Sequence, residues 1–282
     1  MFESAFATVD NLQCAGVGRE PQSEGFSPEF QVCLPYRGLF IWHVGDDDVV
    51  GDANQVLFVS GGEPYRVTEP TPDGYGELIV TPTVPLFSDL VRTADVKATQ
   101  SLFVRRSRRA DATLQSLRAR FLHCAAGVDR GDAFGAEELL MDLLRYSLDA
   151  NSPRLQLTRA TRRLIRDSKL FLEAHFSASV RLSDVAGAVG ASPAYLTDVF
   201  RRVEGVSLHR YLIQLRLAKA LIELPHTNDL TQLALRLGFS SHSHFTAAFR
   251  RAFGCTPSDF RASTRCATTS NGAVSASAMT KQ

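Results

Sequence analysis

The chain carries one pattern twice, as LSDVAGAVG at residues 182–190 and as LTQLALRLG at residues 230–238. Each copy has an alanine at its fifth position and a glycine at its end. The small alanine lets a first helix approach a second one closely, and the glycine ends the first helix because it adopts a left-handed backbone conformation without steric cost. After one inserted residue the match continues, pairing Ser192 with Ser241, Leu196 with Phe245, Phe200 with Phe249, Arg201-Arg202 with Arg250-Arg251, Gly205 with Gly254, Ser207 with Thr256 and Tyr211 with Phe260. The repeat predicts two copies of one helical unit.

A second helix is predicted to follow each glycine. Ser192 is a suitable cap, and Pro193 suits the first helical position. Apolar residues spaced by four, such as Leu196 and Phe200, would lie on the inward face and leave the outward face free. A helix, a short turn with glycine and a second helix form the helix-turn-helix pattern, which binds DNA. A helix over residues 208–224 is predicted to join the two units. The alternative is a pair of purely structural helices, which the basic pairs in register in both copies disfavour.

A family resemblance rests on the second copy above all. The stretches GFSSHSHF at residues 238–245 and FRRAFGCTPSDFR at residues 249–261 closely resemble the signature of the AraC/XylS family, and residues 182–205 resemble it as well. The signature is specific because a glycine-aromatic pair, spaced phenylalanines and Gly-x-Thr-Pro-x-x-Phe-Arg occur together. The resemblance implies two recognition helices that enter successive major-groove segments on one face of duplex DNA. It also implies an N-terminal cupin-type barrel that senses a small molecule or mediates dimerisation.

The resemblance also indicates which side chains would meet a promoter or operator. The candidates are Ser192, Ala194, Tyr195, Thr197, Asp198, Arg201 and Arg202 in the first unit, and Ser241, His242, Ser243, Thr246, Ala247, Arg250 and Arg251 in the second. Arginine can pair with guanine or phosphate, and helix N-termini offer N–H groups to phosphates. Asp198 and Ala247 stand where family members often have a basic residue, so we expect the two units to read DNA unequally. For any single candidate, simple solvent exposure is the alternative.

The first hundred residues are expected to form short strands. Residues 39–44, 55–59 and 76–80 are β-branched or aromatic runs separated by turn-rich pieces, which indicates a small barrel or sandwich. The fold class expected is therefore α+β with two domains. Its parts are a cupin-like sensor or dimerisation barrel (1–106), a helical bridge and hinge (107–157), a double helix-turn-helix domain (158–266) and a disordered tail (267–282).

The bridge should contain two amphipathic helices, with apolar residues at helical spacing in 114–122 and 139–148. They suit a homodimer contact or a packing bridge, and covering the barrel is the alternative. Asn151-Ser152-Pro153 is a candidate hinge.

Charge and composition agree with a DNA-binding regulator. Residues 160–266 hold 15 Lys and Arg against 8 Asp and Glu, whereas the remainder holds 16 against 22. A basic block is the expected footprint of a phosphate-binding module, although an ordinary basic surface is the alternative. No apolar run reaches eighteen residues, no basic flank precedes an apolar stretch at the N-terminus, and the five cysteines form no C-x-x-C pair. We therefore expect no membrane contact, no secretory signal, and reduced thiols in the cytoplasm.

An effector, if sensed, should bind inside the barrel. Candidate lining residues are Tyr36, Arg37, Trp42, His43, Tyr65 and Arg66. An aromatic wall with an arginine would suit an aromatic or carboxylate-bearing ligand, but strand register is not fixed by sequence and half of these residues could face solvent.

The rival function is a cupin-fold enzyme fused to a DNA-binding module. Its metal would need several histidine or glutamate ligands, and Trp42-His43-Val44 lacks the paired histidine. We therefore expect no metal, no cofactor and no enzymatic activity. Control of transcription is the expected outcome of DNA binding, as an activator with a repressor as the alternative, and RNA polymerase is a candidate partner.

Overall fold

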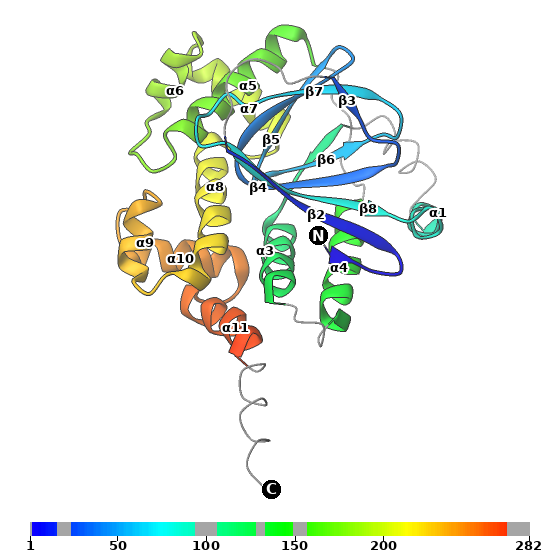
Figure 1. The fold of residues 1–282 in the computed structure, drawn as a ribbon. Helices are drawn as coiled ribbons and strands as arrows, with labels where there is room; N and C mark the ends of the chain where they lie inside the picture. Colours follow the sequence, from blue (N-terminus) through cyan, green and yellow to red (C-terminus); the bar gives the residue numbers. More distant parts are fainter. Residues whose placement is uncertain (1, 16–23, 94–105, 128–132, 149–156, 270–282) are drawn as a thin grey trace, which may run out of the picture.

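The computed structural model describes residues 2–15, 24–93, 106–127, 133–148 and 157–269. A β-rich N-terminal region is followed by a helical C-terminal region (Figure 1). The strands are β1 (Phe2–Glu3), β2 (Ala7–Cys14), β3 (Gly25–Phe26), β4 (Gln31–Val44), β5 (Asp47–Asp52), β6 (Gln55–Val59), β7 (Pro64–Thr68), β8 (Tyr75–Pro82) and β9 (Ser107–Arg109). No described helix is long and apolar enough to cross a membrane.

The long strand β4 belongs to two antiparallel sheets. Its first half pairs with β8 and β6, and its second half pairs with β5 and β7. The register shifts between Pro35 and Arg37, and Gly38 follows with a φ of 67°. A Cβ at Gly38 would lie 2.0 Å from the carbonyl oxygen of Gly74, so only glycine fits where the strand bends. The bend brings the two sheets face to face around an apolar interior.

Two helices cover the outer face of the larger sheet. These are α3 (Ala112–Gly127) and α4 (Ala133–Leu148), and α1 (Val84–Thr93) lies at the sheet's end (Figure 1). Phe121 of α3 and Leu144 of α4 share one core with Leu78 and Val80 of β8. Helix α3 also contacts the helical region, where His123 Nε2 donates to the carbonyl oxygen of Leu221 at 3.0 Å. These helices therefore cover the sheet, and α3 also contacts the helical region.

The C-terminal helices form two groups joined by one central helix. They are α5 (Arg159–Ala174), α6 (Leu182–Ala188), α7 (Pro193–Glu204), α8 (Leu208–Glu223), the short 3-10 helix η1 (Leu224–His226), α9 (Leu230–Arg236), α10 (His242–Phe253) and α11 (Pro257–Thr269). One core lies among α5, α6 and α7, another lies among α9, α10 and α11, and α8 contributes to both. Figure 1 shows α8 running between the two groups.

Two predicted segments fall at the edge of the described residues. Helix α11 continues to Thr269, past the expected domain boundary at residue 266. The rest of the predicted tail, and the candidate hinge at Asn151 to Pro153, lie outside the described residues.

Candidate DNA-binding surface

Helix α7 begins as the sequence predicts. The Ser192 side chain accepts a hydrogen bond from the Tyr195 backbone N–H at 3.3 Å, Pro193 occupies the first helical position, and Gly205 ends the helix with a φ of 71°. Leu196 and Phe200 are fully buried. The exposed predicted residues are Ser192, Ala194, Tyr195, Asp198, Arg201 and Arg202. Thr197 is only half-buried, and its hydroxyl donates to the Pro193 carbonyl at 2.8 Å.

Helix α10 repeats this arrangement. Ser241 accepts from the His244 backbone N–H at 3.1 Å, Phe245 and Phe249 are buried, and Gly254 ends the helix with a φ of 75°. The exposed predicted residues are Ser241, His242, Ser243, Ala247, Arg250 and Arg251. Thr246 is half-buried, and its buried hydroxyl has no hydrogen-bond partner among the described residues.

The outward face of α10 borders an open groove of about 670 Å³. The groove is lined by His242, Ser243, Thr246, Ala247, Arg250, Arg251 and Thr256. Six of these were predicted to meet DNA. Thr256, from the turn that leads into α11, was not. The groove gathers two arginines and several hydroxyl or imidazole groups, which can donate to phosphates and to base edges.

The arginine pairs have a second effect on their own helices. Arg201 and Arg202 lie in the last turn of α7, and Arg250 and Arg251 lie in the last turn of α10. Positive charge there complements the negative end of the helix dipole. The outward face of α7 is less positive than that of α10, because α7 also presents the exposed carboxylate of Asp198 whereas α10 presents no acidic residue.

A buried arginine of α8 fixes the two helical groups to each other. Arg216 donates from Nε to the Phe176 carbonyl at 2.7 Å, from Nη1 to the Gly238 carbonyl at 2.7 Å and from Nη2 to the Ala178 carbonyl at 2.8 Å. Its guanidinium carbon lies 5.8 Å from the centre of the Phe239 ring. Burial lowers the pKa of Arg216. The α5–α6 turn of the first group and the α9–α10 turn of the second are thus held by one side chain.

Gly238 is needed where these two turns meet. A Cβ at this residue would lie 2.7 Å from the Ser177 carbonyl oxygen and 2.8 Å from that of Phe176. Sequence reasoning assigned Gly238 only to helix termination and did not single out Arg216. The available signal was a charged residue within the apolar stripe of the joining helix, beside Leu212 and Leu215.

Comparison with known proteins agrees with this geometry. A family model described as a helix-turn-helix domain matches residues 185–263. The TetD protein of transposon Tn10 from Escherichia coli is 34% identical over 120 residues, which cover 42% of this chain and 87% of TetD. The chain belongs to the AraC family of DNA-binding transcription regulators.

Two further proteins are similar to this AraC-family chain. The transcriptional activator RhaS of Escherichia fergusonii is 33% identical over 153 residues, covering 53% of this chain and 54% of RhaS. The chain therefore spans about half the length of RhaS. The solved C-terminal domain of AraT, a response regulator from Geobacillus stearothermophilus, is 28% identical and covers 39% of this chain and 88% of that domain, with a TM-score of 0.34.

The most specific part of the AraC-family signature serves the fold. Thr256 and Asp259 cap α11 reciprocally, since the Asp259 N–H donates to Thr256 Oγ1 at 3.2 Å and the Thr256 N–H donates to Asp259 Oδ2 at 3.1 Å. The Phe260 ring lies 5.9 Å from Phe249 in the core. Arg261 donates to the carbonyl oxygens of Thr227 and Asn228, both at 3.1 Å. This part of the signature therefore marks how the second group is held together.

The six predicted effector residues do not lie together. Trp42 and Tyr65 face each other inside the curled sheets, with ring centroids 5.7 Å apart. The Tyr36 hydroxyl donates to Asn11 Oδ1 at 2.7 Å. Arg37 is exposed, and Arg66 is exposed and pairs with Glu24 at 3.2 Å.

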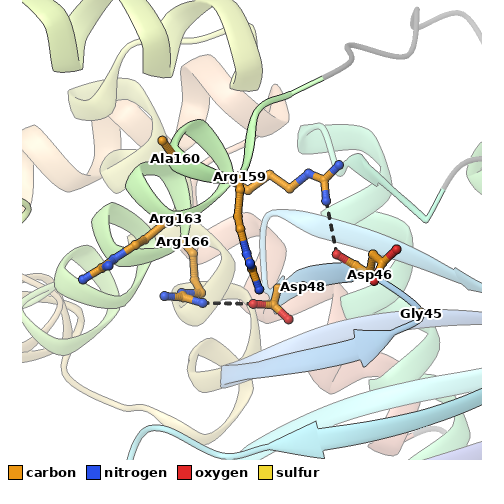
Figure 2. A pocket seen from close by; sticks show the side chains of 8 residues that line it. Gly45, Asp46, Asp48, Arg159, Ala160, Arg163 and Arg166 are labelled. Carbon is orange, nitrogen blue, oxygen red and sulfur yellow. Dashed lines mark hydrogen bonds and ion pairs between the residues drawn. The ribbon is translucent and has the colours of Figure 1, made fainter.

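His43, the sixth, belongs to the junction between the two regions. Its Nδ1 lies 2.7 Å from Asp48 Oδ1, and its Nε2 lies 2.7 Å from Thr68 Oγ1. Asp48 also pairs with Arg166 of α5 at 3.0 Å, as Figure 2 shows. A cavity of about 840 Å³ lies here, lined by Gly45, Asp46, Asp48, Arg159, Ala160, Arg162, Arg163 and Arg166. Asp46 of the β4–β5 turn and Asp48 of β5 thus face the arginines of α5.

A buried polar contact supports the same junction. The Tyr211 hydroxyl of α8 donates to Asp52 Oδ2 at 2.5 Å, and Asn54 Nδ2 donates to the Tyr211 carbonyl at 3.1 Å. Lys169 of α5 pairs with Glu204 of α7 at 2.8 Å, and Gln55 donates to the same glutamate at 3.0 Å. Burial raises the pKa of Asp52, and the nearby Lys169 opposes that shift. The β-rich region is therefore attached to the first helical group through polar contacts that are closed to water.

Proposed function

We propose that this regulator reads its operator with two helix-turn-helix units, α6–α7 and α9–α10, whose outward faces enter successive major-groove segments. The observation that carries the proposal is the contact of Arg216 and Gly238 between the two turns. Two recognition helices can read one DNA face together only if their separation is fixed. Here the separation is fixed by α8 and by the hydrogen bonds of Arg216 to three carbonyl groups.

The second unit is proposed to contribute more than the first. His242 and Ser243 lie at the N-terminus of α10, where side chains of a recognition helix reach base edges. Arg250 would bind a phosphate or a guanine, and Ala247 could contact a thymine methyl group. In the first unit, Asp198 would repel phosphates and could accept a hydrogen bond from a cytosine amino group.

The N-terminal region is proposed to be a cupin-like barrel that senses a small molecule. Support comes from its two face-to-face sheets with an apolar interior, and from the buried polar junction that would transmit a change to α5, α7 and α8. RhaS is an activator by name, and we propose activation here as well, with RNA polymerase as the partner and a homodimer as the working form.

Selection of duplex DNA from a random pool with the full chain tests the proposal. We expect enriched sites with two conserved segments about 10 base pairs apart, which is one turn of the double helix. A single conserved segment would contradict reading by two units. The rival function, a cupin-fold enzyme fused to a DNA-binding module, predicts stoichiometric iron or manganese in the purified protein, which metal analysis would detect.

A further inference from the structure

The interior between the two sheets has a wall of aromatic side chains. Trp42 faces Tyr65 with ring centroids 5.7 Å apart, and Phe40 faces Tyr75 with centroids 4.4 Å apart. All four belong to the same interior cluster, to which β2, β4, β5, β6, β7 and β8 contribute. Tyr65 is only partly buried, so this wall reaches the surface at β7.

A carboxyl group lies next to these aromatic side chains. Glu77 lies on β8 between Tyr75 and Ile79, which both face the interior, and alternation along a strand places all three on one side. The residue is 6% exposed, and its Oε2 has no hydrogen-bond partner among the described residues. The indole N–H of Trp42, a residue 2% exposed, likewise has no hydrogen-bond partner within the described ranges. Buried polar groups are nearly always satisfied, so the Glu77 oxygen is open to a bound water or cation, and the Trp42 N–H is open to a hydrogen-bond acceptor.

The positive charges expected in this interior lie elsewhere. Arg37 is exposed, and Arg66 is exposed and bound to Glu24. The guanidinium carbon of Arg106 lies 6.0 Å from the centre of the Trp42 ring, and Glu63 binds that guanidinium. One aromatic face of this wall therefore already accepts a cation from the chain itself.

We propose that the interior binds an organic cation, an amine or a quaternary ammonium ion, with the Glu77 carboxylate as its counter-ion and the rings of Trp42, Tyr65 and Tyr75 around its positive charge. The inference rests on the proposed sensing function and names the ligand class of that site. Aromatic rings attract cations through their negative faces, and a carboxylate adds direct charge pairing. The arginines that suggested a carboxylate-bearing ligand lie elsewhere, and Glu77 in its ionised form would repel such a ligand.

Proton release should accompany binding. Burial raises the pKa of Glu77 to about 8, so its carboxyl is mostly protonated at neutral pH, whereas a bound cation favours the ionised form. The other titratable groups facing it are Cys14, Cys33, Tyr65, Tyr75 and Glu69, and burial raises the pKa of these thiols and phenols above their ordinary values. A quaternary ammonium ion keeps its charge at every pH. Its affinity should therefore rise roughly twentyfold from about pH 6.5 to about pH 8.5, following ionisation of Glu77.

The test uses the full chain and its single tryptophan, which is Trp42 itself. Tetramethylammonium and choline are titrated at millimolar concentration, with neohexanol as the uncharged carbon isostere of choline and benzoate as the anion. Trp42 fluorescence and thermal melting report binding. We expect both ammonium ions to bind, choline at least about tenfold more tightly than neohexanol, and Glu77→Gln to remove that preference.

Each outcome separates the ligand class from the sensing function. Equal binding of choline and neohexanol, or binding of benzoate alone, would overturn the cation proposal and leave a sensor in place. If neither ammonium ion changes fluorescence or melting, the cation proposal fails, and if no compound of any charge does so, sensing fails with it. Should Glu77→Gln not fold, the pH dependence of choline affinity in the unmodified chain decides, because a flat profile would contradict a role for Glu77.

Discussion

The glycines that end the first helix of each unit offer a matched pair of substitutions, Gly190→Ala and Gly238→Ala. Both residues have a left-handed backbone, with φ of 66° at Gly190 and 83° at Gly238. Their surroundings differ. A Cβ at Gly190 would meet no described atom within 4 Å, whereas one at Gly238 would lie 2.7 Å and 2.8 Å from two carbonyl oxygens of the α5–α6 turn.

The loss of stability from a strained backbone can therefore be separated from the loss caused by overpacking. Either alanine should cost about 1–2 kcal/mol for its left-handed conformation. Gly238→Ala adds overpacking between the two turns, which typically costs about 1–3 kcal/mol. The α5–α6 turn would have to move away, and the same movement would weaken the Arg216 contacts to Phe176 and Ala178. We therefore expect Gly238→Ala to be the more destabilising substitution by about 1–3 kcal/mol.

Urea denaturation of both variants, followed by circular dichroism, measures this difference directly. Operator affinity provides the second assay, because Gly238→Ala should displace one recognition helix relative to the other, whereas Gly190→Ala should leave their separation unchanged. Equal losses of stability in the two variants would refute the close approach of the turns. Equal losses of operator affinity would refute its role in spacing the units.

Three further predictions concern charged groups. Arg216→Met should lower the free energy of unfolding by about 3–5 kcal/mol, since it leaves three carbonyl groups without their donor, and it should weaken a full operator far more than a half-site; equal weakening of both DNAs would contradict the spacing role. Because the folded-state pKa of Glu77 is raised from its ordinary 4.5 to about 8, its contribution to stability is lost as pH rises between those values, by up to ~4 kcal/mol. Glu77→Gln should therefore be more stable than the unmodified chain at pH 8 and lose this advantage near pH 5 in thermal melts, and a pH-independent difference would count against a neutral buried carboxyl. Arg250→Ala should reduce the salt slope of operator affinity by about one if Arg250 binds a phosphate, whereas Arg145→Ala on α4 should not change it; an unchanged slope with relaxed preference at one base would make Arg250 a base reader.

The helical half of this protein follows from short-range rules that a sequence displays. Ser192 and Ser241 cap the helices that they were predicted to cap, and Gly190 and Gly238 have the predicted left-handed conformation. Caps and helix-ending glycines depend on a few neighbouring residues, so the chain itself carries the information. The predicted joining helix over residues 208–224 is also confirmed, with its last residue in a 3-10 turn.

Which side chains of β4 face the interior depends on a register shift that the sequence does not reveal. Cys33 faces the interior before the register shift at Pro35 and Arg37, and Phe40 and Trp42 face it afterwards. One extra residue in a strand reverses which side every later side chain faces. Strict alternation of side chains from Trp42 back along β4 would therefore place Tyr36 in the interior between the sheets. Instead, the Tyr36 hydroxyl donates a hydrogen bond to Asn11.

Long-range contacts were hidden for a similar reason. Arg216 binds carbonyl groups 22 to 40 residues away in the chain. Glu77 interacts electrostatically with Cys33 and Tyr65, which lie on other strands. Neither residue lies in a local motif, so only the fold reveals its partners.

Hydroxyl-radical footprinting on a selected operator is the most direct test of reading by two units. The unmodified chain should protect two segments on one DNA face, about 10 base pairs apart. Replacing Arg250 and Arg251 together by alanine should remove protection of one segment, and replacing Arg201 and Arg202 should remove protection of the other. Protection of a single segment, or loss of the same segment in both variants, would contradict DNA binding by the outward faces of both α7 and α10.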